Sequence, residues 1–142
     1  MKKWFAFGTA ALLFAALPYI ALAKDGVTAV QQEIATAGVH ATLAASADSL
    51  TMTHTHLHHV VNCLVGPKGA GFDTSAENPC KGMGKGAIPD AGSNSKLLGI
   101  LKNALATANA GLKSNKEGMA QQAAKKTAIL LKMAQSPKQT NP

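Results

Sequence analysis

Four of the five histidines of the chain lie in one short run, THTHLHHVV, from Thr53 to Val61. Neutral imidazole nitrogens bind Cu²⁺, Zn²⁺ and Ni²⁺ without the cost of burying a negative charge. Four adjacent imidazoles repel one another once they are protonated, so a need for polarity alone does not explain the run. The candidate ligands in it are His54, His56, His58 and His59. The run therefore predicts a transition-metal site.

How the histidines group depends on whether the segment is a helix or a strand. A strand would place His54, His56 and His58 on one face, but no hairpin partner lies nearby, so a helix is favoured. Residues three or four apart share a helical face, so His54 pairs with His58, and His56 pairs with His59 on a neighbouring face. His40 lies two heptads before His54, about 21 Å away along a straight helix. It joins the site only if the chain folds back between the two residues.

Other residues near the run narrow the choice of metal. Met52 adds a thioether, which favours copper, with zinc and nickel close behind. Asp48 is the only carboxylate close to the run. This scarcity argues against Ca²⁺ and Mg²⁺, which need several oxygen ligands, and against a di-iron centre, which needs glutamates.

Motifs typical of enzymes are absent from the sequence. It contains no H-E-x-x-H, no C-x-x-C-H and no G-x-S-x-G. We therefore expect a protein that is not an enzyme and that buffers, scavenges or carries the metal ion. Two alternatives stay open: a protein-interaction module with a pH-sensitive histidine face, and a helical bundle that binds haem non-covalently.

The first 23 residues have the three parts of a secretory signal peptide. Lys2 and Lys3 precede an apolar run, and the segment ends in a small-residue cleavage site. Cleavage is predicted after Ala23, which would leave residues 24–142 as a single helical domain, periplasmic or secreted, without a stable membrane anchor. A partner protein would then also be an exported one.

Charge and aromatic content argue against nucleic acid as a partner. The formal net charge of +7 falls to +5 once Lys2 and Lys3 are removed, and all of the positive side chains are lysines. Phe72 is the only aromatic residue after Ala23. Nucleic-acid binders usually carry arginine forks for base edges or aromatic rings for stacking.

Apolar spacing predicts helices on both sides of a long loop. The first is expected over 27–46 with Asp25 as N-cap, and the second over 48–65. Whether these form one rod or two helices stays open, with Ser46 and Asp48 as possible caps at a break. A third helix is expected to start at Ser93 or Ser95 and to end within 111–115. A last helix should follow a capping box of Ser114 and Glu117 and end before Pro137.

The segment 66–92 is too rich in glycine and proline for a regular element. Cys63 and Cys80 flank its first half, and in an oxidising compartment we expect them to form a disulfide, with thiolate metal ligation as the alternative. Such a link is worth about 3 kcal/mol in the chain-entropy model. The predicted fold is all-α, a three- to four-helix bundle with a long disulfide-pinned crossover loop, which is also a candidate functional surface.

The block HLHHVVNCLVGPKGAGFD…NPCKGMGKGAIPD, over residues 56–90, resembles a segment of small exported proteins of Gram-negative bacteria. The overall plan is similar to small periplasmic histidine-bearing helical proteins that bind metals. This resemblance implies a metal-binding function, and the histidines that it carries over as ligands are His54, His56, His58 and His59.

Overall fold

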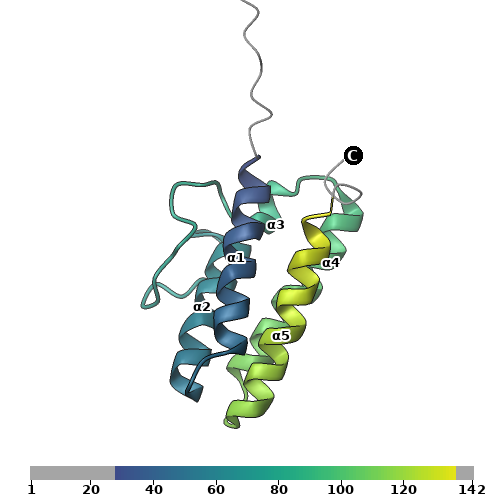
Figure 1. Cartoon of the computed structure of the whole chain (residues 1–142). Coiled ribbons are helices and arrows are strands. Elements are labelled where there is room, and N and C mark those ends of the chain that lie inside the picture. Colours follow the sequence, from purple (N-terminus) through teal and green to yellow (C-terminus); the bar gives the residue numbers. More distant parts are fainter. Residues whose placement is uncertain (1–27, 137–142) are drawn as a thin grey trace, which may run out of the picture.

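A computed structural model describes residues 28–136, and within this range the regular structure is entirely helical (Figure 1). The helices are α1 (Ala29–Ala45), α2 (Leu50–Val65), the single-turn α3 (Ala87–Asp90), α4 (Ser95–Leu112) and α5 (Glu117–Ala134). The predicted all-α fold is confirmed. The predicted signal peptide and Pro137 lie outside the described residues. Asp25 does too, and its prediction as N-cap is wrong, because the N-cap of α1 is Thr28. No described helix is long and apolar enough to cross a membrane.

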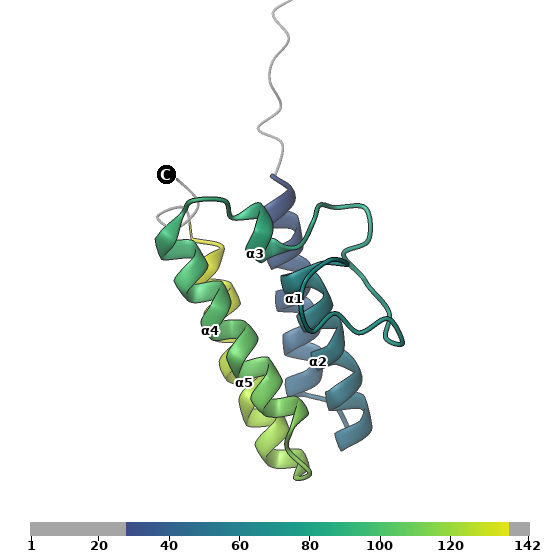
Figure 2. The ribbon, with the colours of Figure 1, turned by 180° about the vertical axis from the view of Figure 1, so that it is seen from behind.

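The four long helices form a bundle of two antiparallel hairpins. The α1–α2 hairpin lies beside the α4–α5 hairpin, with α1 packed against α5 and α2 against α4 (Figures 1 and 2). The short α3 lies at the end of the bundle where α1 and α4 begin. The loop 66–86 projects to the side of α2 (Figure 2).

The first two helices are separate rather than one rod. Ser46 is the C-cap of α1, as expected, whereas the N-cap of α2 is Ser49 and not Asp48. The Ser49 hydroxyl accepts a hydrogen bond from the backbone N–H of Met52 at 3.2 Å, which satisfies a donor that the first helical turn leaves open. The turn between the caps sends α2 back along α1. As a result, the side chain of residue 40 and those of residues 56 and 59 face the same hairpin interface.

The two later helices start close to their predicted positions but with different caps. Asn94 caps α4, its side-chain oxygen accepting from the N–H of Leu97 at 3.0 Å. The capping box predicted at Ser114 is wrong: Lys116 is the N-cap of α5, and the Ser114 hydroxyl instead bonds the backbone N–H and C=O of Lys116. Glu117 is itself the first residue of the helix, so it cannot occupy the third helical position that the box requires.

The core is built largely from alanine with a few large side chains. Leu57, Leu101 and Leu131 are fully buried, and alanines fill much of the space between them. At Gly111 the packing leaves no room for a side chain, since a Cβ there would lie 2.7 Å from the Leu57 side chain and 3.1 Å from Ala123. Small residues let the helices pack tightly, and each buried methyl contributes little free energy on its own.

The long loop is fastened to α2 at several points. Cys63 and Cys80 form the predicted disulfide, with their Cα atoms 5.2 Å apart. Asn62, fully buried, accepts from the N–H of Asp73 at 2.8 Å, and its amide group donates to the Asp73 carbonyl at 2.9 Å and the Glu77 carbonyl at 3.2 Å. A disulfide and a buried amide therefore hold the loop against the helix that carries the histidines.

Candidate metal centre

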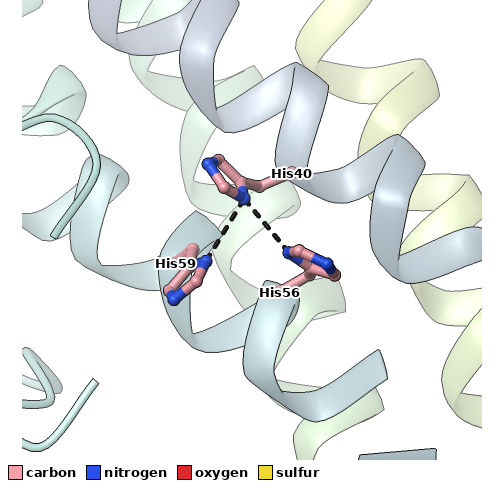
Figure 3. A group of neighbouring side chains, drawn as sticks. All are labelled: His40, His56 and His59. Atoms are coloured by element: carbon pink, nitrogen blue, oxygen red, sulfur yellow. Dashed lines mark hydrogen bonds between the residues drawn. The ribbon is translucent and has the colours of Figure 1, made fainter. Parts of the chain in front are cut away.

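Three histidines from two helices converge on one point. His40 projects from α1, and His56 and His59 project from α2, three residues apart on one helical face (Figure 3). The Nδ1 atom of His40 lies 3.2 Å from that of His56 and 3.2 Å from that of His59. One nitrogen of each ring lies within 4.8 Å of the other two. We call this group the histidine triad.

Hydrogen bonding alone does not satisfy the triad. A neutral imidazole nitrogen carries either one proton or one in-plane lone pair. The Nδ1 atom of His40 meets two other nitrogens at once, so it makes an ordinary hydrogen bond with only one of them at a time. A metal ion removes this conflict, because each nitrogen then directs its lone pair at the same centre.

Two of the three nitrogen–nitrogen distances suit a small transition-metal ion, and the third pair, His56 and His59, lies within 4.8 Å. Zinc–nitrogen bonds of about 2.0–2.1 Å at tetrahedral angles place ligand nitrogens about 3.3–3.4 Å apart. The two contacts of 3.2 Å at His40 are close to this separation. Three imidazoles also leave one tetrahedral position for water or another ligand, as in zinc sites that exchange ligands.

Burial favours the metal-binding form of two rings of the triad, His40 and His59. His59 is 7% exposed, and His40 is half-buried. Burial lowers the pKa of His40, and the neighbouring His59 and His56 rings lower it further. Burial also lowers the pKa of His59, with a further contribution from His56. Both rings therefore favour the neutral state, in which a nitrogen lone pair is free for an ion.

The other two histidines of the run have different partners. The Nε2 atom of His54 lies 3.1 Å from the backbone oxygen of Ser114, at the turn between α4 and α5. The Nδ1 atom of His58 lies 2.9 Å from a carboxylate oxygen of Asp73 in the loop. The structure thus places the predicted pair of His54 and His58 apart from the triad, each ring already holding a polar contact.

Met52 also lies outside the triad. Its side chain is 46% exposed near the start of α2, one turn before His56. His40, by contrast, joins the cluster because the chain folds back at the turn after α1, the condition on which its inclusion depended. No thiolate is free to take part, since the described residues contain no free cysteine.

An acidic residue of the loop lies within electrostatic range of the triad. The charge of Glu77 raises the pKa of both His40 and His59, against the larger lowering by burial. The backbone carbonyl of Glu77 accepts from the Asn62 amide at 3.2 Å, which fixes this part of the loop one helical turn from His59. The loop therefore supplies negative charge near a site that would hold a cation.

Two buried polar residues were not singled out from the sequence. Asn62 interrupts the apolar run VVNCLV, and this polar residue among buried ones was a usable signal for a loop anchor. Glu33 is fully buried on α1, and one of its oxygens accepts from the N–H of Gly86 at 2.8 Å. Its position in an alanine-rich helix gave no comparable signal.

The environment of Glu33 favours a neutral carboxyl group. Burial raises the pKa of Glu33 to about 7. The hydrogen bond from Gly86 opposes this shift, and the nearby Asp90 adds to it. The second carboxyl oxygen is buried without a hydrogen-bond partner among the described residues. A protonated Glu33 is a hydrogen-bond donor, which suits the position beside the Asp90 carboxylate.

Comparisons with known proteins assign no family. Neither models of known protein families nor curated proteins nor solved structures give a significant match to the chain.

Proposed function

We propose that this protein binds one copper, zinc or nickel ion at the histidine triad, and that it acts as an exported metal buffer, scavenger or carrier. The proposal rests on one observation above all, the two Nδ1 contacts of 3.2 Å that His40 makes to His56 and His59. Three imidazole nitrogens this close together can all serve as ligands to one cation.

The ligand set limits the kind of metal. Three neutral imidazoles suit the borderline ions Zn²⁺, Cu²⁺ and Ni²⁺, whereas Ca²⁺ and Mg²⁺ require several oxygens. With both cysteines in the disulfide, the site lacks the thiolates of a closed structural zinc centre. Neutral ligands also leave the ion with its full charge, which nearby Glu77 partly offsets.

Access to the site fits reversible loading. His40 and His56 are half-buried while His59 is buried, so the triad lies at the edge of the hairpin interface and not within the core. An ion at this edge reaches solvent without unfolding of the bundle. Such a site is better suited to uptake and release than to permanent structural binding.

Titration calorimetry of the purified protein with Zn²⁺, Cu²⁺ and Ni²⁺ tests the proposal. We expect saturable binding of one ion per chain, lost in the double variant His40→Ala/His59→Ala. The matched control is His54→Ala/His58→Ala, which removes two histidines of the same run but leaves the triad intact. Equal binding by the wild type and the triad variant, or loss in the control alone, would refute the proposal.

A further inference from the structure

A second candidate site lies at the C-terminal end of α2. There the segment 65–70, α3 and α4 line a partly open cavity of about 630 Å³. Its apolar wall comes mainly from Val65, Ile88, Pro89 and Leu105. Binding sites for small molecules are typically about 300–1,000 Å³ and mostly apolar, with few polar groups. The cavity has the size and lining of such a site, and it shares no residue with the histidine triad.

Close backbone contacts shape this cavity before any ligand arrives. Gly66 and Gly86 both have positive φ, at 68° and 113°, and their backbones cross so closely that side chains do not fit. A Cβ on Gly66 would lie 1.6 Å from the Lys85 carbonyl oxygen, and one on Gly86 would lie 2.5 Å from the nitrogen of Gly66. The crossing fixes the segment 65–70 beside α3, so little ordering is left for binding to induce.

The charged residues that line the cavity are all positive, and the nearby Asp90 carboxylate, which accepts from the backbone N–H of Lys85, lies outside the lining. Lys68, Lys85 and Lys102 belong to the lining, and no aspartate or glutamate does. All three lysines are exposed, which allows their aliphatic stems to extend the apolar wall while the ammonium groups stay in water at the rim. An apolar interior below a cationic rim is complementary to a molecule with an apolar tail and an anionic head.

We propose that this cavity binds a free medium-chain carboxylate. The hydrocarbon tail lies between Ile88 and Leu105, and the carboxylate pairs with the ammonium groups of Lys68 and Lys102. A lysine is a flexible point charge with three donors, so the rim accepts a carboxylate without demanding one orientation.

Calorimetry with decanoate as the probe tests this inference in two comparisons. Decyltrimethylammonium carries the same tail with the opposite charge, and we expect it to bind at least 10-fold more weakly. Octanoate, shorter by two methylenes, should bind roughly 10-fold more weakly than decanoate because less apolar surface is buried. Binding of the cation as tightly as of decanoate would refute the role of the lysines.

Variants place the binding in the cavity. Lys102→Glu should weaken decanoate binding at least 10-fold, and Leu105→Gln should weaken it similarly without changing net charge. Lys96→Glu is the matched control, since Lys96 lies on the same helix, outside the lining, and its replacement changes the net charge equally. Far-UV circular dichroism verifies that each variant is folded. Equal losses in Lys96→Glu and Lys102→Glu, or no saturable binding to the wild type, would overturn the inference.

Discussion

The Nδ1 atom of His40 lies 3.2 Å from the Nδ1 atom of His59, although the two residues are 19 positions apart and belong to different helices. This contact exists only while α2 is folded back on α1. The unfolded chain keeps the local run of histidines but loses the alignment with His40. An ion at the triad therefore binds the folded state more tightly than the unfolded state, and stabilises the fold by that difference.

Zinc should accordingly raise the free energy of unfolding. With free Zn²⁺ at 100 times its dissociation constant, the expected increase is about 2.7 kcal/mol, less any binding to the unfolded chain. Urea denaturation followed by circular dichroism measures it. In His40→Ala the increase should disappear, whereas His54→Ala should keep it. An undiminished zinc effect in His40→Ala would show that the ion binds elsewhere.

Replacing Asn62 by alanine should destabilise the protein by about 1–3 kcal/mol. The change leaves the Asp73 N–H and the carbonyls of Asp73 and Glu77 without their buried partner. Asn103→Ala, at an exposed position of α4, serves as the control and should stay within about 0.5 kcal/mol of the wild type. Urea midpoints measure both effects, and similar values for the two variants would contradict the anchoring role of Asn62.

Glu33 should make stability depend on pH. Its pKa is about 7 in the folded protein against an ordinary value of 4.5, so the folded state holds a proton that the unfolded state releases between these values. The contribution of protonated Glu33 to the free energy of unfolding is complete below about pH 4.5 and is lost as pH rises through 7. At about 1.4 kcal/mol per pKa unit, the loss by pH 8 is about 3 kcal/mol.

The variant Glu33→Gln isolates this effect because glutamine has the same shape and does not titrate. The lowered pKa values of His40 and His59 have the opposite effect on stability, because they make the protein less stable as pH falls below about 6.5. The wild type and the Glu33→Gln variant share this effect, so it cancels in their comparison. Denaturation at pH 5 and pH 8 should show the stability of the variant rising relative to the wild type at the higher pH. Parallel pH profiles would disprove a neutral Glu33.

Reducing the disulfide should lower stability by about 3 kcal/mol. Cys63 lies in the last turn of α2 and Cys80 ties the loop to it, so the reduced chain gains freedom mainly between these residues. Urea denaturation with and without a thiol reductant measures the change. The variant Cys63→Ser/Cys80→Ser is the control, since it should be as unstable as the reduced protein and insensitive to the reductant.

Helix positions followed from the sequence because apolar spacing and turn residues act locally. The break after Ser46 and the start of α4 at Ser95 both lie where the pattern indicated them. Caps were less predictable, as Ser49 and Lys116 show, because neighbouring serines and acids compete for the same backbone donors. The single-turn helix α3 within 66–92 was not predicted, because its proline is typical of a loop.

The histidine run indicates the candidate ligands but not which of these histidines come together in the folded protein. On one helix, His54 pairs with His58 as readily as His56 pairs with His59. Which pair meets His40 depends on how α2 is rotated against α1, and that rotation is set by the burial of Leu57, Val60 and Leu64. A contact between helices is a property of packing, so spacing within a single helix does not specify it.

The crossing of Gly66 and Gly86 has a consequence for how this protein can vary. The chain leaves the end of α2 and returns, some twenty residues later, to the same point, where the two backbones touch. The segment between them is a loop whose two ends are in contact. Extra residues at its exposed positions near Gly71 or Gly82 would therefore lengthen the loop without displacing α3 or α4. We therefore expect the protein to tolerate changes in the length of this loop, but not the replacement of Gly66 or Gly86.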